Sequence, residues 1–412
     1  MHHAARGLIT IAFALSGALI SEAARADLPV TPMLLTQLDA EAHPSAAEGQ
    51  NGFSFARFRP GLWAQPTDWA FALASVEFAE SESPAILDGF VTVVPTPDFR
   101  LTLGYSRDPL FLSARSDLDG TTPMPELSMP SRALWPGRDL GAELHFVPRG
   151  LPLEAWVRIG NGVNGPIGKA VTDSGSFAYT ARLDATAGRA KFDASARDFF
   201  GLHVGIGTYF DDTTDRAGIS GTTEGGYVFF QPPTVNGTRS ITEAHALAYA
   251  GPLRRLVEAG AAFENRSTNA SGNPNGPRTL LDPAATRGAS AELSWMITNQ
   301  RRMLGTWPIH SNNRLFAFDK LGLELAARVE RLDVGRDARG LAASGSTGAS
   351  TSLTCWLSDA MSVAIAGYAF GYDAAPIDEK DRTSSWLLQS RFTIFLNPPP
   401  PNRRQTKMDG KR

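Results

Sequence analysis

Cysteine is almost absent from this sequence, because Cys355 is the only one among 412 residues. One cysteine cannot close a disulfide within the chain, so the protein is not a small scaffold stapled by disulfides. We interpret Cys355 as a small packing residue and not as a nucleophile.

Long hydrophobic runs are also scarce. The apolar run Leu8–Ile20 follows a weakly basic start and precedes Ala24-Arg25-Ala26, which fits an A-x-A cleavage site. This pattern predicts a secretory signal peptide over residues 1–26. Beyond it, no window approaches the ~18 apolar residues that a membrane-spanning helix needs. The mature chain is therefore expected to be either soluble and exported, or to cross a membrane as a β-barrel.

The sequence lacks the signatures of several functional classes. Its formal net charge of −3 gives no basic footprint for nucleic acid. Its seven histidines show no dense metal-ligand spacing, so neither a metal site nor a cofactor is expected. The segment Gly218–Thr222 lacks the last glycine of a nucleophile elbow. We therefore predict no catalytic residues and no enzymatic activity.

What the sequence does contain is strand alternation. The stretch Phe99–Phe146 has two arms in which apolar and polar residues alternate, joined by a long loop rich in Pro, Ser and Asp. This period of two places one apolar face and one polar face on each strand. In the segment 321–330, Glu324, Arg328 and Glu330 share one face. Three ionised groups there would be costly in a dry core but cost little in a water-filled lumen.

Loop lengths extend this pattern. Short links at 95–98, 148–150, 251–252 and 359–360 interleave with long ones at 108–138, 211–237, 266–287 and 331–348. Short turns at one end and long loops at the other are typical of an all-β, transmembrane antiparallel β-barrel of about 16 strands. Residues 191–197 and 226–231 leave the strand count ambiguous. An exported soluble β-rich adhesin or binding protein is an alternative, because it would show the same leader and strands.

We predict four segments along the chain. After the signal peptide comes a flexible lead-in over residues 27–51, which is rich in Pro, Ala and Glu. The barrel then occupies residues 52–396. A disordered, proline-rich basic tail follows over residues 397–412.

Several motifs resemble the phosphate-selective porin O and P family of Gram-negative outer membranes. Leu103–Pro109 resembles its strand ending in a basic-acidic-proline step, and Arg132–Gly141 resembles its R-A-L-x-P-G-R-D/N-x-G return. Ser294–Arg301 is similar to its S-[WY]-x-L-T-G-E-x-R motif, with Asn299-Gln300 in place of G-E. Glu324–Asp333 is the closest match.

The resemblance implies a homotrimeric porin in the outer membrane, surrounded by outer-membrane lipid, with its third loop folded into the lumen as a constriction. It implies passive diffusion of small hydrophilic solutes, anionic or neutral, with a preference for phosphate-like anions. The residues expected at the constriction, where solute would bind, are Arg107, Arg115, Asp117, Asp119, Arg132 and Arg138. The residues expected to line the lumen are Arg100, Glu143, Arg158, Arg182, Glu324 and Arg328.

Both sets of residues mix acidic and basic side chains. Channel selectivity follows the sign and geometry of the charges along the pore, so this mixture weighs against strict phosphate selectivity. An outer-membrane barrel with hydrolase activity is the alternative function.

Overall fold

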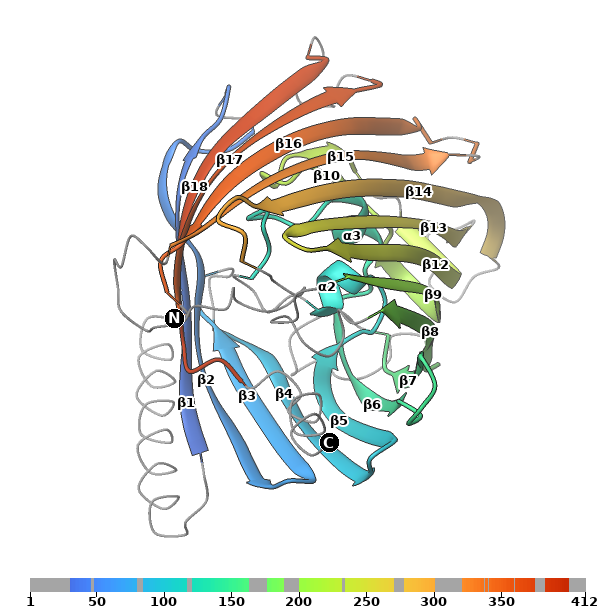
Figure 1. Ribbon diagram of the computed structural model, residues 1–412. Coiled ribbons are helices and arrows are strands. Elements are labelled where there is room, and N and C mark those ends of the chain that lie inside the picture. Colours follow the sequence, from blue (N-terminus) through green and yellow to red (C-terminus); the bar gives the residue numbers. More distant parts are fainter. Residues whose placement is uncertain are drawn as a thin grey trace, which may run out of the picture.

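The computed structural model describes residues 30–399, except 46–47, 80–83, 117–120, 163–175, 189–199, 232–233, 270–277, 301–320, 337, 340, 359 and 375–381. Sixteen strands of this part of the chain close into a barrel (Figure 1). All neighbouring strands of the barrel are antiparallel. They also follow one another along the chain, except that β1 pairs with β18 and β9 pairs with β12. The predicted all-β barrel of about sixteen strands is confirmed.

The wall strands vary in length. They are β1 (Val30–Ala42), β2 (Gly52–Thr67), β3 (Ala70–Glu77), β4 (Ala85–Thr96), β5 (Phe99–Arg107), β6 (Arg138–Phe146), β7 (Leu153–Gly160), β8 (Ala178–Gly188), β9 (Phe200–Ala217), β12 (Thr234–Ala250), β13 (Leu253–Asn269), β14 (Arg278–Met296), β15 (Gly322–Arg336), β16 (Ser344–Trp356), β17 (Met361–Tyr372) and β18 (Ser384–Leu396).

Four shorter elements of the described residues lie outside the wall. The helices α2 (Leu112–Ser116) and α3 (Met129–Leu134) both belong to the connection between β5 and β6. The strands β10 (Gly221–Thr222) and β11 (Val228–Phe230) form a separate two-stranded sheet. Among the described residues, no helix has the length and apolar character needed to cross a membrane.

The barrel carries its apolar side chains on the outside. Along β15, Leu325 and Val329 are 42% and 60% exposed, whereas Glu324 and Arg328 are 2% and 4% exposed. A soluble sheet packed on a core would bury the apolar set instead. The faces are therefore arranged as in a barrel that meets lipid outside and water inside.

The first strand corrects the predicted lead-in. Residues 30–42 form β1, which pairs with β18 and closes the barrel, so the flexible lead-in predicted over 27–51 is wrong there. On this strand the inward side chains Met33 and Leu35 pack on Phe395, while Leu34 and Leu38 face outward. Because both faces begin with apolar residues, the alternation that marks the other strands is hidden. The barrel begins at Val30 and not at residue 52.

The connections differ from the prediction in two respects. The segments 211–237 and 266–287 were predicted to be long loops. Strands β9 and β12 extend into the two ends of the first, and strands β13 and β14 take up 266–269 and 278–287 of the second. Met296 and Gly322, which bound residues 297–321 in the sequence, lie at the same end of the barrel as the short turn 251–252, so the two ends are not separated as cleanly as predicted.

Several predicted segments lie outside the described residues. They are the signal peptide over 1–26, the ambiguous stretch 191–197 and the tail from residue 400. The other ambiguous stretch, 226–231, contributes β11 to the small sheet and not to the barrel wall.

Candidate functional site

The connection between β5 and β6 crosses the barrel. Its helix α3 contacts β13, β14 and β15, which lie on the opposite side of the strand order from β5 and β6. Figure 1 shows α2 and α3 within the ring of strands. We call residues 108–137 the crossing segment.

Apolar side chains anchor the crossing segment to the wall. Leu110, Phe111 and Leu134 are fully buried and pack against residues of β9, β12 and β13. At Gly260 on β13, an added Cβ would lie 2.8 Å from Phe111 Cζ and 3.0 Å from Leu134 Cδ1. The missing side chain at Gly260 therefore lets the segment seat directly on the sheet.

Buried carboxylates of the wall bind the ends of both helices. The Ser113 amide donates to Glu258 Oε1 at 2.9 Å, and the Ser131 hydroxyl donates to Glu258 Oε2 at 3.0 Å. The Met129 amide donates to Glu330 Oε2 at 2.6 Å. These charge-assisted bonds satisfy buried amides of the segment and fix its position.

The predicted constriction residues are bound to partners. Arg115 donates through both Nη atoms to the carboxylate of Glu143, with Nη1 at 2.6 Å from Oε2. Arg138 Nε donates to Asp88 Oδ1 at 3.2 Å, and Arg107 Nη1 donates to the Ala114 carbonyl at 3.2 Å. Asp117 and Asp119 lie outside the described residues.

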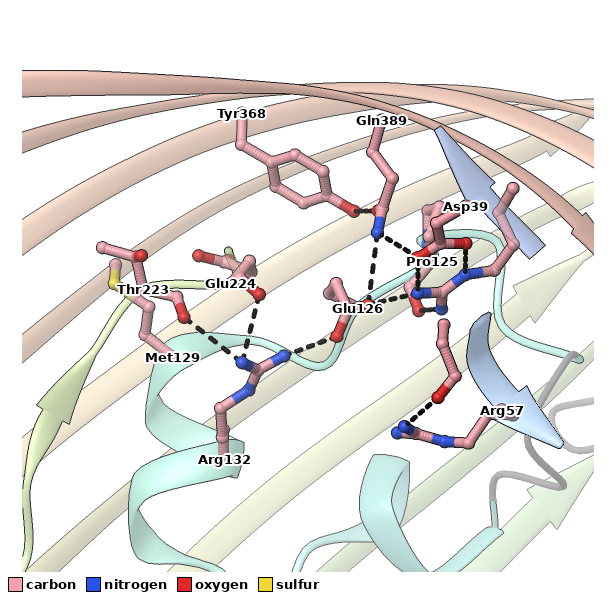
Figure 2. Close-up of polar contacts among 12 residues, drawn as sticks. Asp39, Arg57, Pro125, Glu126, Met129, Arg132, Thr223, Glu224, Tyr368 and Gln389 are labelled. Atoms are coloured by element: carbon pink, nitrogen blue, oxygen red, sulfur yellow. Dashed lines mark hydrogen bonds and ion pairs between the residues drawn. The ribbon is translucent and has the colours of Figure 1, made fainter. Parts of the chain in front are cut away.

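Arg132, the remaining predicted residue, joins the crossing segment to a second connection. Its Nη1 donates to the carbonyls of Thr223 and Glu224 at 3.2 and 3.1 Å, and its Nη2 pairs with Glu126 (Figure 2). Arg132 therefore links the crossing segment to the connection between β9 and β12, and also to Glu126 of the segment itself.

The predicted lumen-lining residues lie on inward faces. Arg158, Arg182 and Arg328 are each at most 4% exposed, as are Glu143 and Glu324, and Arg100 is half-buried. The structure brings the arginines to local partners: Arg158 to Ser106 Oγ at 2.8 Å, Arg182 to Asp184 at 2.7 Å, and Arg328 to Glu224 at 2.8 Å. Arg182 and Arg328 therefore lie against carboxylates, whereas Arg158 donates to a neutral hydroxyl.

The sequence did not reveal the role of Glu126 in the crossing segment. Its carboxylate receives hydrogen bonds from Arg132, Arg391 and Gln389, and Gln389 Nε2 also donates to Asp39 at 2.8 Å (Figure 2). Burial raises the pKa of Glu126, but the guanidiniums of Arg391 and Arg132 outweigh it and lower the pKa to about 2. Glu126 is therefore a fixed anion that holds the segment to β18.

A second connection, around β10 and β11, also reaches the crossing segment. Tyr227, Phe229 and Phe230 share an apolar cluster with Met124 and Met129. The pKa of Glu224 in this connection is raised well above its usual range. Burial is the larger cause, and the neighbouring carboxylate of Glu330 adds to it. The aromatic run 227–230 within a predicted loop was the only sequence signal for this contact.

A cavity of about 290 Å³ lies between the crossing segment and the wall. Three guanidiniums line it, from Arg132, Arg216 and Arg239, together with Trp135 and Tyr209. Two of these arginines are paired with carboxylates: Arg239 Nε lies 2.9 Å from Glu264, and Arg216 Nη1 lies 3.8 Å from Asp211. The cavity combines donors that suit an anion with acceptors that limit its positive charge.

Asp108, at the start of the crossing segment, predicts a pH dependence of stability. Burial raises the pKa of Asp108 from 3.8 to about 6, against the opposing hydrogen bonds from Thr180 and Leu110. Since the folded pKa is above the unfolded one, this stabilisation is present below about pH 4 and is lost as the pH rises through about 6, amounting to about 3 kcal/mol. Asp108→Asn should remove this part of the slope in urea unfolding from micelles. An unchanged slope would contradict the assignment.

Three potential metal ligands also meet among the described residues, although the sequence predicted no metal site. They are Asp184, His203 and His245, whose ligand atoms all lie within 4.8 Å of one another. They come from three different strands, so no sequence spacing could mark them. Only the register of β8, β9 and β12 brings them together.

Of the comparisons with known proteins, the one with solved structures found proteins of the same fold. No family model and no curated protein matches the sequence. An anion-selective porin from Comamonas acidovorans superposes with a TM-score of 0.56 at 10% identity, covering 90% of this chain and 100% of that chain. OmpT of Vibrio cholerae gives 0.53 at 12% identity, with 89% and 97% covered. OprB of Pseudomonas putida gives 0.52 at 9% identity, with 92% and 97% covered.

These likenesses establish the fold of outer-membrane porins. They do not single out the phosphate-selective O and P family that the motifs resemble.

Proposed function

We propose that this protein is an outer-membrane porin through which small hydrophilic solutes diffuse passively. The observation that carries the proposal is the arrangement of faces in a closed barrel, with apolar side chains outside and charged side chains inside. Such a barrel can pass through lipid while enclosing water. We propose no enzymatic activity.

The crossing segment supplies the constriction in this proposal. Irregular backbone at membrane depth is tolerated only where protein or water satisfies it. Here the amides of Ser113 and Met129 find wall carboxylates, and apolar contacts hold both helices. A segment fixed in this way narrows the path of a solute without closing it.

The proposed preference is for anions, and we expect it to be weak. The three guanidiniums around the cavity support it, as does the fold shared with an anion-selective porin. The paired carboxylates oppose it, so strict phosphate selectivity is not part of the proposal. We also propose that the signal peptide exports the chain to the Gram-negative outer membrane, where it forms a homotrimer. A trimer form is described for OmpT of Vibrio cholerae.

The reversal potential across a salt gradient tests the sign of the selectivity. Wild-type channels in planar bilayers should show a small potential of the sign that anions produce. The double variant Arg216→Gln, Arg239→Gln should move it toward cations, because both side chains line the cavity.

Arg331→Gln is the matched control, because Arg331 pairs with Asp373 beyond the outward apolar run of β15. Clear cation selectivity of the wild type would contradict the anion preference. Absence of any channel from a correctly folded barrel would contradict the proposed function as a whole.

A further inference from the structure

Asp184, His203 and His245 stand on three adjacent strands of the inner wall, β8, β9 and β12. Gly205 of β9 is in register with Asp184 on one side and with His245 on the other. A Cβ at Gly205 would lie 2.1 Å from Asp184 Oδ1 and 2.3 Å from His245 Cε1. The glycine therefore opens the space in which the carboxylate and the imidazole approach each other.

The distances suit a single ion. His203 Nε2 lies 2.9 Å from Asp184 Oδ2, and His245 Nε2 lies 3.6 Å from Asp184 Oδ1. Bonds of ~2.0–2.2 Å from a metal to nitrogen and oxygen would bridge such atoms with small side-chain adjustments. His203 is the half-buried member, so the cluster is open on one side.

Both imidazoles have a second partner that orients them. His245 Nδ1 donates to Glu243 Oε2 at 3.1 Å, which leaves Nε2 as an acceptor toward the cluster. His203 Nδ1 lies 3.1 Å from the Thr186 hydroxyl, which can accept its proton when Nε2 binds a metal. Histidines that bind metals characteristically have such a partner on the other ring nitrogen.

One cation already competes for this carboxylate. Arg182 donates to Asp184 through Nε at 2.8 Å and Nη2 at 2.7 Å, and Nη2 lies 3.3 Å from His245 Nε2. Its Nη1 is held separately by the Pro109 carbonyl at 2.6 Å. An ion between Asp184 and His245 would compete with the Nη2 contacts. The bond from Arg182 Nε to Oδ1 can remain, because each carboxylate oxygen has a second lone pair.

We propose that Asp184, His203 and His245 bind one divalent transition-metal ion on the lumen wall, beside the start of the crossing segment. Two imidazoles and one carboxylate suit Zn²⁺, Co²⁺ or Ni²⁺, whereas Mg²⁺ and Ca²⁺ prefer sites made only of oxygen. Three protein ligands leave a coordination position for water or a passing solute. The inference does not rest on the proposed porin function, because binding is measured without transport.

The test is titration of the purified full chain, without an added polyhistidine tag, with Zn²⁺ by calorimetry and with Co²⁺ by visible absorption. One ion per chain should bind. His203→Gln should weaken binding by more than the ~10–100-fold that loss of a supporting partner costs. Glu243→Gln should fall within that range, and Arg182→Gln should tighten binding because a competing cation is gone.

His145→Gln is the matched control. His145 also lies on the inner wall, stacks on Trp156 with ring centroids 4.3 Å apart and pairs with Glu154 at 3.1 Å, but it is not part of the cluster. It should leave the affinity unchanged. Failure of the folded wild type to bind either ion at a single saturable site would overturn the proposal. Equal weakening by His203→Gln and His145→Gln would overturn it too, and heat-modifiable migration of each variant verifies its fold.

Discussion

Replacing residues 114–130 with Gly-Ser-Gly should raise the single-channel conductance several-fold while leaving the barrel intact. The segment crosses from β5 to the far wall, so its removal opens the cross-section of the pore. The cut ends can be joined without distortion, because the hydroxyls of Ser113 and Ser131 are 3.3 Å apart. Planar-bilayer recording measures the conductance, and heat-modifiable migration verifies the fold.

The same excision should not by itself shift selectivity toward cations, because it removes Arg115 together with the acidic Asp117, Asp119 and Glu126. It also takes Arg115 away from Glu143 and the Met129 amide away from Glu330, and it leaves both carboxylates on the inner wall. The control is Glu143→Gln with Glu330→Gln in the intact loop, which changes charge without changing bulk. Conductance that stays at the wild-type value after excision would show that the segment is not the constriction.

Leu325→Arg should prevent most of the protein from folding into lipid. Leu325 lies within the outward apolar run of β15 between Leu323 and Val329, and it is 42% exposed. An arginine near the middle of a bilayer costs a barrel about 2–4 kcal/mol, which corresponds to about 30- to 1,000-fold in the folding equilibrium. Folding from urea into lipid vesicles, followed by electrophoretic mobility, measures the loss.

Leu280→Arg is the matched control for this substitution. Leu280 is 83% exposed and lies near the start of β14, away from the middle of the wall, where the same change costs about 0–1 kcal/mol. Equal folding of the two variants would show that the outward surface of β15 does not face lipid.

The sequence predicted the barrel wall because a period of two is a local property. Glu324, Arg328 and Glu330 alternate with Leu325 and Val329, and the structure places them on the predicted faces. The strand β1 escaped prediction because Met33 and Leu35 give its inner face an apolar start. A strand whose inward face is covered by other side chains can carry apolar residues on both faces. It then lacks the apolar–polar alternation of a strand whose inward face borders water.

The sequence placed the charged residues on the inner surface but could not pair them. Arg391 and Glu126 are separated by 265 positions, and they meet only after the crossing segment has reached β18. Asp184 and His245 likewise meet because both strands are in register with Gly205. Partnerships of this kind depend on strand register and loop path, which a single sequence does not contain.

The pairing of β1 with β18 also constrains the order of assembly. Gln37 Nε2 donates to the hydroxyl of Thr393, across a separation of 356 positions. The contact that closes the barrel therefore joins residues from nearly opposite ends of the described sequence. Contacts of such separation carry a large loop-closure cost and slow the folding reaction. Until β18 has formed, the unclosed sheet has two unpaired edges that could recruit other chains. We expect removal of β18 alone to convert the folded protein into an aggregating one, although the other wall strands and the crossing segment remain in the sequence.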